Sequence, residues 1–139
     1  MISFTFLLKK NTDSVNTILH KNWLKTVISL EGKKTGDIQY IFCDDNHLHK
    51  INKAYLNHDT LTDIITFATT NNENIISGEI YISIDRVYEN ANDQSVLFSD
   101  ELSRVIVHGV LHLIGYDDHS ISEKKLMREK EDYYLHLQQ

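Results

Sequence analysis

Two histidines four residues apart are the feature of this sequence with the clearest chemistry. His108 and His112 lie in the stretch HGVLHLIGYDDHS, which spans 108–120. At positions i and i+4 of a helix, two side chains share one face, with their Cβ atoms about 6 Å apart. This is the spacing at which one helix gives two imidazoles to a single metal ion. The pair therefore predicts a metal site, with a chance pair on a helix face as the alternative.

A third ligand is available directly after the pair. Gly115 allows the chain to turn back, and Asp118 and His119 follow shortly after it. Zinc accepts imidazole nitrogen and carboxylate oxygen, usually in four-coordinate geometry. Three protein ligands leave one position for water, which is the catalytic and not the structural arrangement. We therefore predict one Zn²⁺ ion bound by His108, His112 and either Asp118 or His119.

The residues around the pair favour a shared metal. Between Val105 and Ile114 the predicted helix is nearly all apolar apart from its histidines, and buried polar groups without partners are costly. A metal would supply the missing partner. The residue after His108 is Gly109 and not glutamate, so the HExxH pattern of zinc peptidases, with its glutamate base, is absent. This absence counts against a peptidase.

Hydrophobic periodicity predicts the elements that position this site. Strands are expected at 2–8, 37–43, 64–67 and 79–84, and helices at about 13–30, 44–55, 85–93, 99–114 and from 120 onward. Gly115 is expected to end the helix that carries the histidines. This βαβαββααα order predicts a single α/β (α+β) domain over residues 1–139. It would have a mixed sheet of about four strands with about five helices packed on it.

Composition narrows the class of protein. The chain of 139 residues is 41% hydrophobic and 24% charged, as in ordinary soluble proteins. No apolar run approaches the ~20 residues of a membrane span, and the N-terminus lacks a signal-peptide pattern. The only cysteine, Cys43, permits no internal disulfide, so a cytoplasmic location is expected. A net charge of −6 argues against a broad basic face for duplex nucleic acid but permits a local basic groove.

Three segments resemble the YbeY family of metal-dependent endoribonucleases, also called rRNA maturation factors. HGVLHLIGYDDH resembles the family signature HGxLHLxGYDH. YLNHDTLTDIITF at 55–67 resembles YRxxDxPTDVLSF, and GEIYIS at 78–83 resembles the strand GDIxIS. The resemblance implies one zinc ion and cleavage of single-stranded RNA in 16S rRNA 3′-end maturation and ribosome quality control. It also implies rRNA and the small ribosomal subunit as partners, with no membrane, in the cytoplasm.

The sequence departs from the family pattern in two places. The family's third ligand is a histidine ten residues after the first, where this chain has Asp118, with His119 one place later. Both therefore stay candidates. The resemblance implies that the family's arginine after the tyrosine binds phosphate. This position is Leu56 here, and leucine has neither the charge nor the donors to do so. Arg86, Arg104 or a lysine are candidates to replace it in space.

The resemblance also implies a role for His58 and Asp59, which would hold substrate or orient a water near the metal. We accordingly predict a catalytic set of His108, His112, His58 and Asp59. Asp117 is expected to accept the free N–H of a metal-bound histidine. The remaining histidines are expected on the surface: His20, His47, His49 and His136.

Two alternative functions stay open. Leu56 leaves room for a zinc-containing ribosome-assembly factor that binds RNA without cleaving it. The metal site alone is also compatible with another type of zinc hydrolase.

Overall fold

The computed structural model describes residues 1–8, 17–56 and 62–138. Its elements in chain order are β1 (Ile2–Phe6), α1 (Thr17–Leu30), β2 (Lys34–Cys43), α2 (Asp45–Leu56), β3 (Ile64–Ala68), β4 (Ile75–Ser83), α3 (Ile84–Gln94), α4 (Phe98–Ile114) and α5 (Ile121–Leu137). This is the predicted βαβαββααα order, so the predicted α/β class, with its four strands and five helices, is confirmed for the described residues. No helix among them combines the length and apolar composition needed to cross a membrane.

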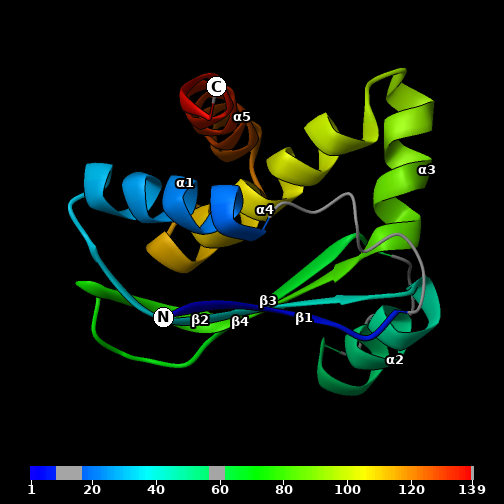
Figure 1. Ribbon diagram of the computed structural model, residues 1–139, viewed down its shortest axis with the longest axis horizontal. Helices are drawn as coiled ribbons and strands as arrows, with labels where there is room; N and C mark the ends of the chain where they lie inside the picture. The colour runs from blue at the N-terminus through cyan, green and yellow to red at the C-terminus, as the bar shows by residue number, and fades with distance from the viewer. Residues whose placement is uncertain (9–16, 57–61, 139) are drawn as a thin grey trace.

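A mixed sheet separates two unequal layers of helices. The strand order is β1-β2-β4-β3, with β2 parallel to both β1 and β4, and β3 antiparallel to β4. Figure 1 shows α1, α4 and α5 on one face of the sheet, α2 on the other and α3 at one end. The β3 strand therefore lies at an edge of the sheet, where it runs alongside α4.

The main core lies between the sheet and the layer of α1, α4 and α5. Fully buried side chains come from two helices and two strands: Leu24, Val27 and Ile28 of α1, Tyr40 and Phe42 of β2, Ile80 and Ile82 of β4, and Ile106 and Val110 of α4. The Tyr40 hydroxyl donates to the Ile106 carbonyl at 2.7 Å and ties β2 to α4. A smaller cluster under α2 contains Cys43, which is buried at the end of β2.

The starts of α3 and α4 differ from the sequence prediction. The predicted helix over 85–93 begins one residue earlier, at Ile84, and its N-cap residue Ser83 accepts from the Arg86 backbone N–H at 3.2 Å. Helix α4 begins at Phe98 with Leu97 at its N-cap and no side-chain cap. An apolar residue is tolerated at the N-cap of α4 because most of the stability of a helix in a folded protein comes from tertiary packing.

Helix α5 begins as predicted and buries a narrow stripe of side chains along one face. Ser120 and Glu123 form a capping box, with Glu123 Oε1 accepting from the Ser120 N–H at 2.8 Å. Met127, Glu131 and Tyr134 are buried. Three other large side chains of this helix are exposed: Leu126, Tyr133 and Leu137. They lie off the single face, spaced by three or four residues, that meets the rest of the protein.

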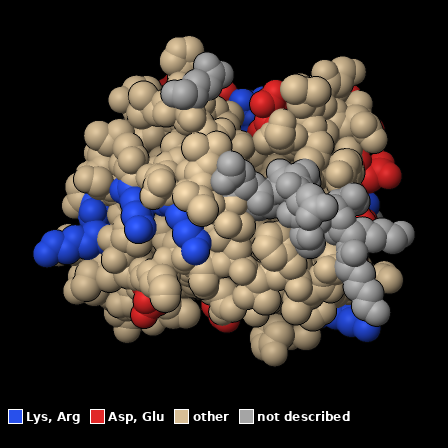
Figure 2. Space-filling model, in the orientation of Figure 1, with Lys and Arg blue, Asp and Glu red and all other residues tan. Residues whose placement is uncertain are grey.

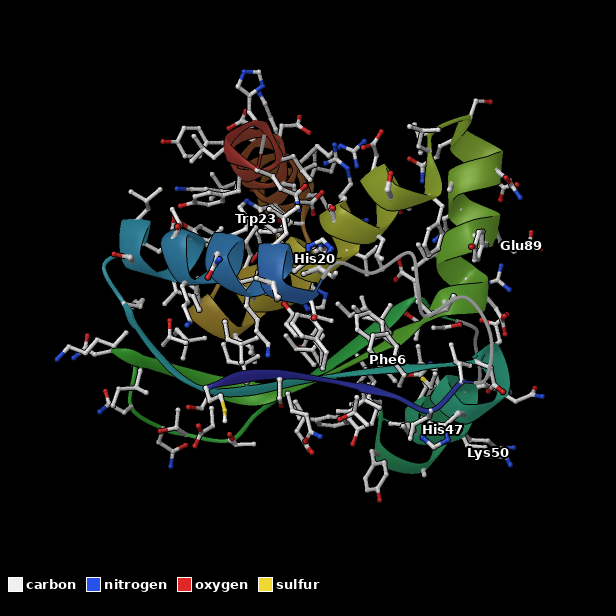
Figure 3. All side chains as sticks on the ribbon, viewed as in Figure 1. Phe6, His20, Trp23, His47, Lys50 and Glu89 are labelled. Atoms are coloured by element: carbon white, nitrogen blue, oxygen red, sulfur yellow. The ribbon has the colours of Figure 1, made fainter. Side chains whose placement is uncertain are left out.

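His20 is buried, contrary to the surface position predicted for it. It has 5% of its surface exposed and lies beside Trp23 on the inner side of α1 (Figure 3). Burial lowers the pKa of His20 and so favours its neutral form. Trp23 donates from Nε1 to the Tyr134 carbonyl at 2.8 Å, which fastens α1 to α5. His47 and His136 are exposed, as predicted.

Candidate metal centre

Gly109 allows α4 to pack close against the sheet. A Cβ atom at this position would lie 2.9 Å from Ile64 Cδ1 and 2.9 Å from Ile80 Cγ2, which is closer than packed carbon atoms approach. The glycine after the first histidine is therefore a packing requirement. It sets the distance between the helix that carries His108 and His112 and the edge strand β3.

The turn after α4 brings a carboxylate back over both histidines. Gly115 has φ +125°, a conformation that side chains rarely adopt, and its N–H bonds the Leu111 and His112 carbonyls. Beyond this turn, Asp118 Oδ2 lies 3.3 Å from His108 Nε2 and 3.4 Å from His112 Nε2. The three ligand atoms lie within 4.8 Å of one another. The turn predicted at Gly115 thus gathers three metal-binding side chains.

The distances within this group fit a divalent metal such as zinc. Ligands about 2.0–2.2 Å from a tetrahedral zinc lie about 3.3–3.6 Å from each other. Both distances from Asp118 to the histidines agree with this separation. Two imidazoles and one carboxylate are also a donor set that zinc accepts. His119 is exposed and is not in the group, so of the two predicted candidates the geometry favours Asp118.

Glu131 of α5 orients the first histidine. His108 Nδ1–H donates to Glu131 Oε2 at 2.6 Å, which leaves Nε2 to face Asp118. Such a hydrogen bond from the distal ring nitrogen is usual for metal-bound histidines. The ring of His112 is hydrogen-bonded to the backbone of Tyr116. The acceptor at His108 is thus not Asp117, which is exposed, but a residue 23 positions along the chain.

The surroundings shift the pKa values of the two histidines in opposite directions. Burial lowers the pKa of His108, but the hydrogen bond and charge of Glu131, with the charges of Asp118 and Asp63, outweigh it and raise the pKa overall. Burial and the neighbouring His108 lower the pKa of His112. His112 is therefore held neutral, which is the state a metal requires of its imidazole ligands.

The three residues line a pocket of about 510 Å³ between α4, α5 and β3. Its other described lining residues include the carboxylates Asp63, Glu101 and Glu131 and the guanidinium groups of Arg104 and Arg128. Burial raises the pKa of Asp63, and burial together with the charge of Asp63 raises that of Glu101. The pocket is thus rich in carboxylates beside the candidate metal ligands.

Glu131 also fixes an arginine at the pocket. Arg104 Nη1 donates to Glu131 Oε1 at 2.8 Å, and its Nη2 donates to Asp132 Oδ1 at 2.7 Å. One buried carboxylate therefore holds both His108 and Arg104. Arg86 instead pairs with Asp45 at 2.9 Å and does not line the pocket. Of the two arginines proposed to replace the one missing at Leu56, only Arg104 shares a pocket with that leucine.

A polar cluster around Glu31 braces the turn that carries Asp118. Tyr116 donates from its hydroxyl to Glu31 Oε1 at 2.5 Å. Lys130 Nζ donates to Glu31 Oε2 at 3.1 Å, and the Tyr134 hydroxyl also donates to that oxygen. The end of α1, the turn after α4 and α5 are thereby joined at one carboxylate. This cluster links residues far apart in the sequence, and no local pattern in the sequence indicates it.

His58 and Asp59 lie outside the described residues. Their neighbours Leu56 and Asp63 both border the pocket. Asp63 accepts from Asn90 Nδ2 at 3.4 Å, and Thr62 Oγ1 donates to the Ile64 carbonyl at 3.3 Å. The described residues define a small α/β protein with a candidate catalytic metal centre in an acidic pocket.

Comparison with known proteins identifies a family to which this chain is similar. A family model described as Endoribonuclease YbeY matches residues 6–138. The endoribonuclease YbeY of Flavobacterium johnsoniae is 52% identical over 133 residues, covering 95% of this chain and 93% of that protein. The protein of the same name from Christiangramia forsetii is 50% identical over 118 residues, covering 85% and 82% of the two chains. The chain therefore belongs to the endoribonuclease YbeY family, as the sequence motifs predict.

A solved structure shares the fold of this chain. The solution structure of TM1509 from Thermotoga maritima matches with a TM-score of 0.69 and 29% identity, covering 99% of this chain and 89% of that one.

Proposed function

We propose that this chain is a zinc-dependent endoribonuclease that cleaves single-stranded RNA in 16S rRNA 3′-end maturation and ribosome quality control. Membership of the endoribonuclease YbeY family supports metal-dependent RNA cleavage and a part in rRNA maturation. The choice of zinc, the small ribosomal subunit as partner and the cytoplasm as location are parts of the proposal. The observation that carries it is the convergence of His108, His112 and Asp118 in one pocket.

We assign these three residues as the metal ligands. The distances from Asp118 to the two histidines, together with the nitrogen and oxygen donors, suit one zinc ion. A zinc ion in this group would polarise a phosphoryl oxygen and make a bound water more acidic. Glu131 keeps His108 in the tautomer that presents Nε2.

The shape of the pocket supports a single-stranded substrate. At about 510 Å³ it has the size of a site for a small ligand and can admit a nucleotide. A pocket of this volume cannot enclose a base-paired helix, so we propose that the phosphodiester reaches the candidate metal ligands from an unpaired strand. We propose that His58 and Asp59, whose neighbours border this pocket, contact the substrate or orient a water there.

The test is cleavage of an rRNA precursor that carries the 3′ extension of 16S rRNA. Zinc-loaded protein should cut it, a chelator should stop the reaction, and His112→Ala should abolish it. His136→Ala, which changes an exposed histidine of α5, is the matched control and should cut normally. Equal cleavage by His112→Ala would refute the proposal. Zinc-dependent binding to small subunits without any cleavage would favour the assembly-factor alternative.

A further inference from the structure

The pocket poses an electrostatic problem for an RNA substrate. Four carboxylates line it, and the described lining residues include two arginines and no lysine. RNA is a polyanion, and proteins that bind it supply positive charge along the path of its backbone. Basic side chains on the face shown in Figure 2 gather at the side of α1 and form no broad basic surface. Among the described residues that line the pocket, positive charge beside the histidines can therefore come from Arg104 and Arg128.

Arg104 is the better placed of the two arginines for a fixed contact. Its side chain is 20% exposed and is held by the carboxylates of Glu131 and Asp132. Arg128 is 57% exposed, and its Nη1 lies 3.8 Å from Glu131 Oε1, which is too far for a hydrogen bond. A guanidinium held in place loses little entropy when it binds a phosphate, whereas a mobile one loses more.

The two ion pairs do not use all the N–H donors of Arg104. A guanidinium has more N–H donors than two single contacts use. Glu131 shares its negative charge with His108, and Asp132 is exposed, so solvent screens that ion pair. Arg104 therefore keeps free N–H donors and part of its positive charge at the pocket. Its partner Glu131 also holds His108, one of the proposed metal ligands.

Position 56 lies in the same pocket and carries no charge. Leu56 and Arg104 both line it, one at the end of α2 and the other on α4. Two elements far apart in the chain can thus present a side chain to the same space. A cation supplied from α4 could do there what leucine at the end of α2 cannot.

We propose that Arg104 binds a phosphate of the RNA beside the metal centre, in place of a cation at position 56. Arg128 adds screened attraction at the rim of the pocket. This inference rests on the proposed endoribonuclease function and extends it to a substrate-binding residue. It requires that Arg104 act through its charge and its position, and not merely by supporting Glu131.

The experiment compares Arg104→Gln with Leu56→Arg/Arg104→Gln on a fluorescent single-stranded RNA. Arg104→Gln should lower kcat/KM about 100-fold, as expected for loss of a fixed charge-stabilising donor. It should change zinc affinity by less than about threefold, because Glu131 still bonds His108. The double variant should recover at least about tenfold of the lost kcat/KM, because it returns a guanidinium to the same pocket. Arg86→Gln, which removes an arginine paired outside the pocket, is the matched control and should behave as the unmodified protein.

RNA binding, measured by anisotropy against salt concentration, separates this inference from the proposed function. Loss of one phosphate contact should make the slope of log K against log salt shallower by about 0.7–1. If the unmodified protein binds RNA without cutting it, the proposed function fails while this change in slope still supports the role of Arg104. An unchanged slope and unchanged kcat/KM in Arg104→Gln overturn it. A loss of activity that follows a loss of zinc, or that Leu56→Arg does not relieve, also overturns it.

Arg104→Lys covers the case in which Arg104→Gln does not fold. Lysine keeps the charge but not the planar fork, so kcat/KM should fall about tenfold. Adding Leu56→Arg to this variant should restore most of the loss, and the absence of any restoration overturns the inference.

Discussion

Glu131 Oε2 lies 2.6 Å from His108 Nδ1, while the other nitrogen of the same ring lies 3.3 Å from Asp118. The two carboxylates therefore lie on opposite edges of one imidazole. Glu131 is buried and reaches the ring from α5, whereas Asp118 reaches it from the turn after α4. The packing of α5 on α4 thus sets the direction in which His108 presents its free electron pair.

Glu131→Gln should weaken zinc binding. Loss of the carboxylate removes the charge that makes His108 a better ligand, and such changes typically cost about 10–100-fold in metal affinity. The measurement is competition for zinc with a chromophoric chelator at neutral pH. Glu129→Gln changes an exposed glutamate on the same helix and should bind zinc normally. Equal affinities of the two variants would show that Glu131 does not support the metal ligand.

Asp118→Ala should remove most of the zinc affinity, by about 100-fold or more, because it deletes one of three protein ligands. His119→Ala should have little effect, since His119 lies outside the group formed by His108, His112 and Asp118. Asp117→Ala is the control for loss of a carboxylate in the same turn. The same chelator titration decides: a larger loss in His119→Ala than in Asp118→Ala would reverse the assignment.

Gly109→Ala should destabilise the protein. Alanine favours a helix over glycine by about 1 kcal/mol, but its Cβ would press against Ile64 and Ile80. Overpacking of this kind typically costs about 1–3 kcal/mol. We expect the free energy of unfolding in urea to fall. A gain in stability would mean that α4 moves away from the sheet without cost.

Glu31→Gln should also destabilise the protein, in a manner that depends on pH. Burial raises the pKa of Glu31, but hydrogen bonds from Tyr116, Tyr134 and Lys130 outweigh it and lower the pKa overall. The carboxylate therefore stabilises the fold above its ordinary pKa, and this contribution is lost as pH falls through the lowered value. At neutral pH we expect a loss of about 1–3 kcal/mol.

Denaturation of Glu31→Gln across a pH series checks this expectation. The difference from the unmodified protein should shrink toward acid pH. Glu89→Gln, at an exposed position of α3 (Figure 3), should show no comparable difference at any pH. A deficit in Glu31→Gln that stays constant down to strongly acid pH would contradict the role given to the carboxylate.

Cys43 should be inert in the folded protein. Burial, with the nearby charges of Asp44, Asp45 and Asp85, raises the pKa of its thiol to about 12. Because the thiolate is the reactive form, a disulfide reagent should label Cys43 at mildly alkaline pH only after denaturant is added. Labelling of the native protein at the rate of a free thiol would show that this region opens readily.

Local features made much of the fold and part of the site predictable. The spacing of His108 and His112 and the glycine at 115 act within a few turns of chain, so their consequences follow from helix geometry. The strand and helix order follows equally from hydrophobic periodicity. The choice between Asp118 and His119 as third ligand did not follow from local features, because it depends on how a short turn folds back over α4.

The remaining parts of the site depend on packing between distant elements. Glu131 lies 23 residues from His108, and Glu31 lies 85 residues from Tyr116. His20 is the one polar residue among the five that α1 buries, so its burial could not be inferred from its residue type. Such contacts are fixed by the way α1 and α5 pack on α4, which no short motif encodes.

The most direct measurement is a crystal structure of the zinc-loaded protein with anomalous data collected at the zinc absorption edge. We predict one peak, bonded to His108 Nε2, His112 Nε2 and the Asp118 carboxylate at about 2.0–2.2 Å. A peak held by His119 with Asp118 turned away, or no peak between the two histidines, would contradict the proposed metal centre.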